Sequence, residues 1–223
     1  MRAAPGLTAV IPALNAAATL PRTLASLSSA AEIIVVDGAS NDSTRDVAEQ
    51  FGARWLAAPR GRGSQIAAGV AEAHCEWLLI IHADTTLVPG WEQRARLHMA
   101  HCPGKAGYFR FALDSAEPVA RRLERRVAWR CRVLALPYGD QALLIHRDLL
   151  QNVGGIRCLP LMEDVDLIRR LGRRRLVMLD AVAVTSAVRW EREGWRRRSA
   201  RNLLCLGLWF AGVPAHRIAS LYR

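Results

Sequence analysis

The chain has 223 residues, of which 51% are hydrophobic and 23% are charged. A chain of this length can bury a substantial core, and no linker rich in Pro, Gly or Ser divides it, so we expect one domain of the α/β class. The formal net charge is +11, and because Lys105 is the only lysine, arginine supplies nearly all of the positive charge. Such an excess is typical of proteins that meet polyanions, namely nucleic acid, an anionic membrane surface or a diphosphate, although genome composition alone can also produce it.

The beginning of the sequence does not resemble a secretory leader. Residues 1–6 carry a single arginine, and Pro12 and Asn15 interrupt the apolar stretch that follows. The five cysteines are scattered without a C-x-x-C pair, which is typical of reduced thiols and argues against a zinc knuckle or a disulfide framework. We therefore expect a cytoplasmic protein.

The first half alternates between short apolar runs and segments with helical spacing. Strands are predicted over residues 7–11, 33–37, 54–57 and 77–84. Helices follow the first three strands and carry apolar residues at helical spacing: Leu20, Leu24 and Leu27, then Val47 and Phe51, then Ile66 and Val70. Strands that alternate with helices imply right-handed β-α-β units and a doubly wound sheet.

The second half has a different pattern. Strands are predicted over residues 106–113, 142–146, 175–179 and 181–188, and Pro118 opens an arginine-rich helix with Val119, Leu123 and Val127 facing inward. A basic segment, 189–201, then leads into an apolar run, 203–210, which is too short to span a bilayer.

Two of the predicted strands end on an aspartate. Asp37 is followed by Gly38, Ala39 and Ser40, and Asp84 by two threonines. In open α/β sheets, ligands bind at the carboxyl ends of the strands, so these two aspartates indicate a binding site.

Six motifs occur in an order that is typical of one family. They read VIPALN, IIVVDGASNDST, RGRGSQIAAG, IIHADT, YGDQALLIHRD and GGI followed by LMEDVDLIRRL. Together they resemble a family 2 glycosyltransferase of the GT-A fold, over nearly the whole chain. The compact length and the ending that starts RWEREGWRRRSARNLL are similar to the small bacterial subgroup of selenodomain-associated or arsenosugar-biosynthesis glycosyltransferases.

The resemblance implies a single GT-A domain over residues 1–223, with a doubly wound, mixed but mostly parallel sheet flanked by helices. Residues 1–100 would form the nucleotide-sugar half, residues 101–188 the acceptor half, and residues 189–223 a basic and apolar helical segment. The implied activity is inverting transfer of a sugar from a UDP or GDP donor to a hydroxyl acceptor. Ser186 replaces the glutamine of the Q-x-x-R-W motif of processive members, so we expect a non-processive enzyme.

For the donor, the resemblance implies a site near the strand ends. Asp84 occupies the D-x-D position and would hold Mn²⁺ or Mg²⁺ with the diphosphate oxygens, and His82, which replaces the first aspartate, is a further candidate ligand. Asp37 would accept a hydrogen bond from the base. The implied nucleotide-sugar site consists of Pro12, Ala13, Asn15, Asp37, Arg62, Gln65, His82, Ala83 and Asp84.

For catalysis, the resemblance points to the acidic pair before the acceptor-side helix. Asp164 would be the general base that takes the proton of the acceptor hydroxyl, and Glu163 would orient it or bind the acceptor. The same pair also suits the N-terminus of a helix through the helix dipole. The implied acceptor-binding residues are Asp140, Gln141, Arg189 and Trp190.

Two other classes of protein remain as alternatives. A metal-dependent nucleotidyltransferase usually carries a basic, Gly-rich loop after the first strand, where this chain has Pro12-Ala13-Leu14-Asn15. A nucleic-acid-binding protein is supported by charge alone, and nucleic acid is not an expected partner. The expected partners are a nucleotide sugar and a small-molecule or lipid-linked acceptor. The C-terminal segment predicts either peripheral contact with an anionic membrane or a helix packed on the core.

Overall fold

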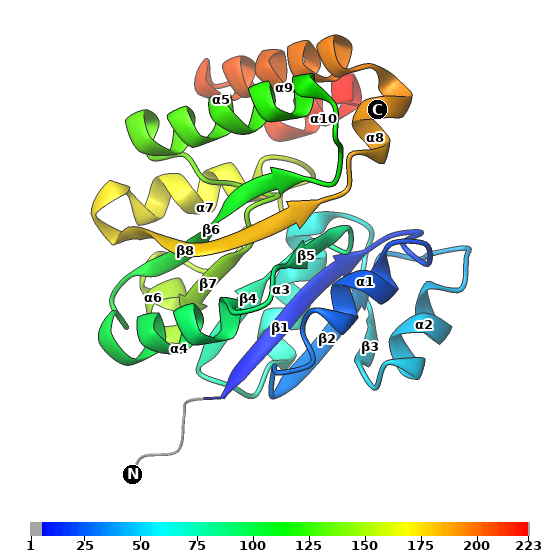
Figure 1. Ribbon diagram of the computed structural model, residues 1–223, viewed down its shortest axis with the longest axis vertical. Helices are drawn as coiled ribbons and strands as arrows, with labels where there is room; N and C mark the ends of the chain where they lie inside the picture. The colour runs from blue at the N-terminus through cyan, green and yellow to red at the C-terminus, as the bar shows by residue number, and fades with distance from the viewer. Residues whose placement is uncertain (1–5, 223) are drawn as a thin grey trace.

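A computed structural model describes residues 6–222, in which eight strands form one sheet in the order β3-β2-β1-β4-β7-β6-β8-β5 (Figure 1). The strands β1 to β4 are parallel, as are β6 and β8, whereas β7 runs antiparallel to both of its neighbours and β5 antiparallel to β8. The predicted single-domain α/β fold with a mixed, mostly parallel sheet is confirmed. The strands are β1 (Leu7–Ala13), β2 (Glu32–Asp37), β3 (Arg54–Ala57), β4 (Trp77–Ile80), β5 (Thr85–Leu87), β6 (Ala106–Leu113), β7 (Leu143–His146) and β8 (Leu176–Thr185).

Helices cover both faces of this sheet because the central strands are apolar on both faces. On β1, Ile11 packs in the same cluster as α1, α2 and α4, while Val10 packs in the cluster that includes α6 and α7, with α3 beside it. Alternate side chains of a strand point to opposite faces, so a continuous apolar run can serve two helical layers. The helices are α1 (Leu20–Ala25), α2 (Thr44–Gln50), α3 (Arg62–Glu72), α4 (Trp91–His101), α5 (Pro118–Leu134), α6 (Arg147–Asn152), α7 (Glu163–Leu171), α8 (Val188–Glu193), α9 (Trp195–Phe210) and α10 (Ala215–Tyr222).

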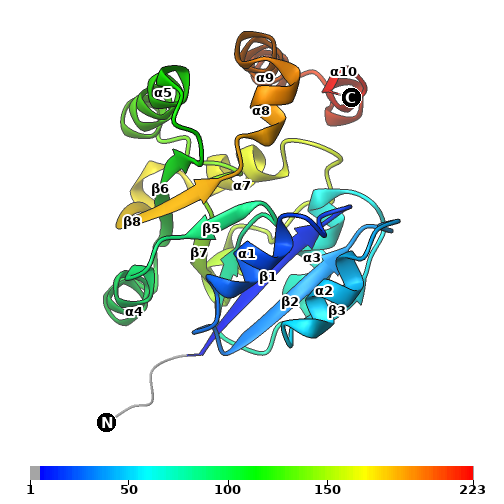
Figure 2. The same cartoon turned by 45° about the vertical axis from the view of Figure 1, so that its right-hand side comes forward.

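The helices α5 and α8–α10 stand above the sheet at one end of the molecule (Figure 2). Helix α5 packs on β6 through Val127 and Cys131, which are buried with Phe111. Helices α9 and α10 pack on the segment before α7, where Cys205 and Ile218 are buried. The two helical groups therefore form the walls above the carboxyl ends of the strands.

Two predicted strand boundaries are wrong. The strand that begins at Trp77 ends at Ile80, because residues 81–84 form a turn in which the Thr85 N–H donates to the His82 carbonyl. The two strands predicted on either side of Asp180 are one strand, β8, which ends before α8 begins at Val188. The register of β8 on β6 shifts at this point, and the exposed Asp180 carboxylate pairs with Arg94 at 3.0 Å. A polar residue at such an irregularity does not end the strand.

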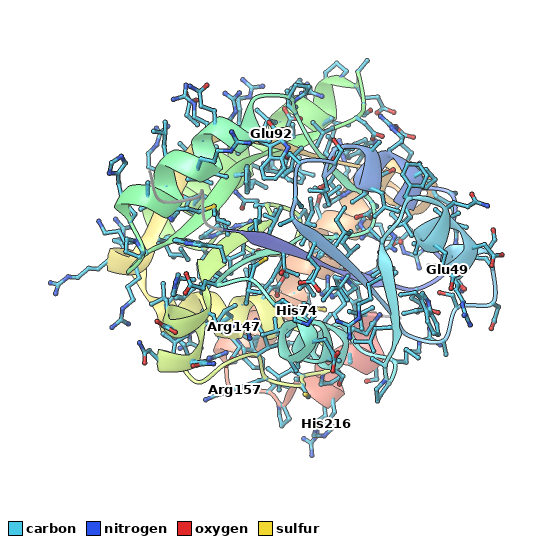
Figure 3. The ribbon with its side chains drawn as sticks, turned by 90° about the horizontal axis from the view of Figure 1, so that it is seen from below. Glu49, His74, Glu92, Arg147, Arg157 and His216 are labelled. Atoms are coloured by element: carbon cyan, nitrogen blue, oxygen red, sulfur yellow. The ribbon has the colours of Figure 1, made fainter. Side chains whose placement is uncertain are left out.

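Arg147, labelled in Figure 3, follows β7 and makes polar contacts with the chain between α3 and β4. Its guanidinium donates to the carbonyls of Val70, Ala73 and Cys75, and thereby fixes the end of α3 to the end of β7.

No helix within residues 6–222 is long and apolar enough to cross a membrane.

Candidate functional site

A cavity of about 450 Å³ opens beyond the carboxyl end of β4 and beside β6 and β8, between the sheet and the helices α5, α8 and α9. Its polar lining includes Arg62, His82, Asp84, Asp140 and Asp164. These residues come from four different segments of the sequence, and each was predicted as a site residue. The predicted acceptor residues Gln141, Arg189 and Trp190 line the same cavity.

Asp84 lies in the turn between β4 and β5, and its backbone is held from two sides. The Thr23 hydroxyl donates to the Ala83 carbonyl at 3.1 Å, and the Ser186 N–H donates to the Asp84 carbonyl at 2.9 Å. The half-buried carboxylate faces the cavity. Because both flanking segments are fixed, the carboxylate is preorganised for a ligand.

The Asp164 and His82 side chains both lie close to Gly139. Gly139 has a φ of +61°, and a methyl group added to its Cα would lie 2.9 Å from Asp164 Oδ2 and 3.4 Å from His82 Cε1. Only glycine adopts this backbone conformation without strain and also leaves room for both side chains. Asp164 Oδ1 accepts a hydrogen bond from the Val165 N–H at 2.7 Å, so Oδ2 is the oxygen next to Gly139.

Next to Asp164 in the sequence, the buried Glu163 carboxylate forms an ion pair with Arg62, which lines the cavity. The Glu163 side chain is 2% exposed, and its Oε1 lies 2.9 Å from Arg62 Nε. Burial raises the pKa of Glu163 to about 7, although Arg62 opposes this shift. Burial disfavours the charged form of Arg62, but Glu163 and Asp164 hold the pKa of its guanidinium above the ordinary value. Arg62 is thus a fixed positive charge next to Asp164.

His82 is surrounded by charges of both signs. Burial and the nearby Arg62 lower the pKa of His82, whereas Asp84, Asp140 and Asp164 oppose that shift. The imidazole is therefore neutral at neutral pH and keeps a nitrogen lone pair.

A second group of predicted donor residues lies at the ends of β1 and β2, outside the lining of this cavity. Ala13 is paired with Asp37 in the sheet, next to Pro12. The Asp37 carboxylate accepts from the Ser40 hydroxyl at 2.5 Å, and Asn15 joins the two strand ends through Ser40 and Asn41. The loops after β1 and β2 are thus fixed to each other at the edge where the resemblance implies the base of the nucleotide.

Three predicted site residues have structural contacts that sequence reasoning missed. The buried Gln65 amide donates to the carbonyls of Ala13 and Val36, both at 2.7 Å, so it joins the ends of β1 and β2. The buried Gln141 amide donates to the Phe109 carbonyl. The Trp190 ring is buried and stacks on Trp195 with centroids 5.8 Å apart. These placements favour positioning roles for Gln65, Gln141 and Trp190 over direct contacts with a ligand.

Sequence reasoning also missed the side chains that α5 adds to the cavity. The inward-facing residues predicted for this helix were Val119, Leu123 and Val127, but Arg126 and Arg130 also line the cavity. The Arg130 guanidinium lies 3.7 Å above the centre of the Tyr138 ring. Burial raises the pKa of Tyr138 to about 12, with Arg130 opposing, so its hydroxyl stays neutral. Only the packing of α5 against β6 reveals which arginines face the cavity.

The donor set at Asp84 suits a divalent cation that is shared with a ligand. Within residues 6–222, no three side chains of His, Cys, Asp or Glu come close enough together to hold a metal by themselves. Mg²⁺ and similar cations often bind through one or two carboxylates and complete their shell with phosphate oxygens and water. Asp84 fits this mode, and His82 is the nearest further donor in the turn.

The comparison with known proteins agrees with this geometry. Curated relatives include uncharacterized glycosyltransferases of Mycobacterium bovis and Mycobacterium tuberculosis, each 38% identical over 85 residues. That match covers 38% of this chain and 39% of each relative, so it spans well under half of their length.

The fold is shared with solved structures of glucosyl-3-phosphoglycerate synthase from Mycobacterium tuberculosis. One complex with Mn²⁺ and UDP-glucose has a TM-score of 0.57 at 21% identity, and one with Mn²⁺, UDP and glucosyl-3-phosphoglycerate has a TM-score of 0.55 at 22% identity. Each alignment covers 82% of this chain and 70% of that protein.

The sequence also matches the family described as Glycosyl transferase family 2 over residues 8–131, a span that contains β1 to β6 and most of α5. This match favours a glycosyltransferase over the nucleotidyltransferase and nucleic-acid-binding alternatives, and it confirms the predicted family. The smaller selenodomain-associated subgroup stays a prediction. On the family match, the shared fold and the site at the carboxyl ends of the strands, the chain belongs to glycosyl transferase family 2.

Proposed function

We propose that the protein is a non-processive, inverting glycosyltransferase that moves a sugar from a UDP or GDP donor to the hydroxyl group of an acceptor. One observation carries the proposal: Arg62, Asp84 and Asp164 line a single cavity at the carboxyl ends of the strands. They supply a positive charge for a diphosphate, a carboxylate for a cation, and a carboxylate for a proton. These are the three chemical requirements of the reaction.

In the proposed reaction, the acceptor oxygen attacks the anomeric carbon of the sugar from the face opposite the diphosphate. The new C–O bond forms as the bond to the diphosphate oxygen breaks, and the bonding electrons leave with the nucleoside diphosphate. Asp164 takes the proton of the acceptor hydroxyl through Oδ2, because Oδ1 is engaged by the Val165 N–H. Arg62 balances the negative charge that grows on the leaving diphosphate.

A divalent cation at Asp84 would supply Lewis-acid stabilisation of the leaving diphosphate. The similar synthase structures contain Mn²⁺ or Mg²⁺ together with UDP, which supports the same cofactors here. Asp37, Asn15, Pro12 and Ala13 would receive the nucleoside, since they form the neighbouring strand ends. Asp140 and Arg189 would contact the acceptor in the cavity.

The test is thermal unfolding of the protein with a panel of UDP- and GDP-sugars, with and without Mn²⁺, followed by assay of nucleoside diphosphate release. We expect the matching nucleotide to raise Tm by about 5 to 10 °C at roughly a hundredfold excess over Kd. The effect should depend on the metal.

The Asp84→Asn variant should lose the metal-dependent part of the shift and about 10²-fold or more of the transfer rate. Asp148→Asn is the matched control, because Asp148 is an exposed aspartate of α6 outside the cavity. The proposal is wrong if no nucleotide stabilises the protein in either condition, or if Asp84→Asn keeps the full metal-dependent shift.

A further inference from the structure

The cavity has an apolar part in addition to its charged lining. Beyond the carboxylates, it extends between α5 and α9, where its walls are apolar side chains. The α5 wall presents Leu123, Trp129 and Leu134, and the α9 wall presents Leu203 and Leu206. Binding sites commonly combine such an apolar wall with a few polar groups that fix the orientation of the ligand.

This apolar wall continues to the molecular surface. Trp129 and Leu203 line the cavity and yet are 59% and 71% exposed. They lie on α5 and α9, the two helices that stand apart above the sheet in Figure 2. The cavity therefore has an apolar mouth, through which an elongated ligand can leave the site without exposing all of its apolar surface.

Positive charges also line this cavity. Arg126 and Arg189 line the cavity, and neither forms an ion pair within residues 6–222. By contrast, the cavity-lining Arg198 is already paired with Glu193 at 2.7 Å. Unpaired guanidinium groups beside an apolar channel are complementary to a negatively charged group on a hydrocarbon chain.

We propose that the acceptor is an anionic amphiphile, with its charged group against Arg126 and Arg189 and its hydrocarbon chain between α5 and α9. The inference rests on the proposed function and specifies its acceptor. The hydroxyl that receives the sugar is next to the anionic group, at the end of the molecule that faces Asp164. Its transfer step is the one given above.

The test uses alkyl phosphates as probes, measured by titration calorimetry below their micellar concentrations and without any donor. Dodecyl phosphate should bind at least about tenfold more tightly than ethyl phosphate, because burying even two methylene groups gives about that factor. It should also bind more tightly than neutral dodecyl maltoside. Equal affinity for the two phosphates would overturn the proposal and indicate a small anion as the ligand.

Two matched pairs of variants locate the binding. Leu203→Gln should weaken dodecyl phosphate binding about three- to tenfold without affecting ethyl phosphate binding. Leu204→Gln, at another exposed position of α9 that lies outside the cavity, should leave both unchanged. Arg126→Gln should weaken both phosphates, and Arg122→Gln, on the outer side of α5, should weaken neither. All four side chains are exposed, so each variant should fold.

The variants distinguish a failure of the amphiphile site from a failure of the proposed function. Equal effects of Leu203→Gln and Leu204→Gln would mean nonspecific adsorption to the helices and would overturn the amphiphile site. If Leu203→Gln and Arg126→Gln weaken dodecyl phosphate binding and their controls do not, the amphiphile site is supported. This holds even if no nucleotide stabilises the protein, because a missing nucleotide effect would contradict only the proposed donor chemistry.

Discussion

At the scale of single residues, the two central carboxylates are held in different ways. The Asp84 backbone is fixed by Thr23 and Ser186, which leaves its side chain without a hydrogen bond within residues 6–222. Asp164 has one oxygen engaged by the backbone of α7 and the other against Gly139. An unengaged carboxylate suits a cation, whereas a carboxylate with one oriented free oxygen suits proton transfer in a defined direction.

Replacing Asp164 by asparagine should therefore affect the chemical step. Asn keeps the size and the contact with the Val165 N–H but cannot take a proton, so kcat should fall by roughly 10²- to 10⁴-fold, as is typical when a general base is removed. Nucleotide-sugar affinity, measured by titration, should stay within a fewfold of the parent. A collapse of that affinity at unchanged kcat would instead make Asp164 a donor-binding residue.

Gly139 should be required for the position of Asp164. In a Gly139→Ala variant, the new methyl group would meet Asp164 Oδ2 at 2.9 Å and hold an alanine at positive φ, which costs about 1 kcal/mol or more. We expect kcat to fall by more than the loss of thermal stability can explain, because the methyl group displaces the Asp164 carboxylate. Gly172→Ala is the control, because Gly172 also has positive φ but has no neighbour near its Cα. Equal activity of the two variants would contradict this role.

The sequence was sufficient to predict which acidic residues gather at the cavity but not the contacts around them. Asp84 and Asp164 were found because strand ends and helix starts can be recognised locally. The hydrogen bonds of Gln65 and Gln141 to backbone carbonyls were not foreseen, because a polar residue in a motif does not show which partner it has. Gly139 was missed because its requirement depends on Asp164, which is distant in sequence.

At the scale of helices and strands, β1 to β3 were predictable, since each of these strands is followed directly by a helix with apolar residues at helical spacing. The error at β8 has a physical cause: a polar Asp180 interrupts the apolar pattern, but its side chain points to solvent at a register shift. The pairing of β7 between β4 and β6 was not predictable from local pattern, because strand order is decided by tertiary contacts.

The C-terminal helices pack on the core, as one of the two sequence interpretations expected. Cys205 and Ile218 are buried against Leu161 and Val165, and Arg198 and Arg201 both pair with Glu193. These contacts leave a different set of groups on the outer face of α9. Its exposed side chains include Arg196, Arg197, Leu204 and Phe210.

This outer face predicts weak and reversible attachment to an anionic membrane. The protein should co-sediment with phosphatidylglycerol vesicles at low ionic strength and dissociate at high salt, because exposed charges are screened over about 10 Å at 0.1 M salt. An Arg196→Gln, Arg197→Gln double variant should bind at least a fewfold more weakly, at about 1 kcal/mol per arginine. Arg94→Gln, on the distant α4, is the control (Figure 1). No sedimentation at low salt would exclude attachment through this face.

At the scale of the whole molecule, one buried ion pair joins the two parts of the chain at the site. Arg62 begins α3, in the part expected to bind the donor, and Glu163 begins α7, in the part expected to bind the acceptor. Because the Glu163 side chain is almost fully buried, removing its charge from water is costly, and the attraction of Arg62 must offset that cost. The protonation state of this carboxyl therefore affects the stability of the fold.

The stability of the fold should decrease as the pH rises through the pKa of Glu163. The pKa of Glu163 is raised from 4.5 to about 7 in the folded protein, so between these values the folded state holds a proton that the unfolded chain has released. The stabilisation from this group is complete below pH 4.5 and is lost as the pH rises through 7. The full shift corresponds to at most about 3 kcal/mol.

Urea unfolding at pH 5, 6, 7 and 8 measures this contribution. Relative to the parent, Glu163→Gln should become progressively more stable as the pH rises, because glutamine keeps the neutral form at every pH, and Glu117→Gln, at an exposed position, should follow the parent. If the ion pair with Arg62 instead outweighs the effect of burial, the pKa of Glu163 in the folded protein would lie below 4.5, and the stability difference between Glu163→Gln and the parent would not change between pH 5 and 8. The slope of the difference with pH thus tells whether burial or the charge of Arg62 dominates at the point where the two parts of the chain meet.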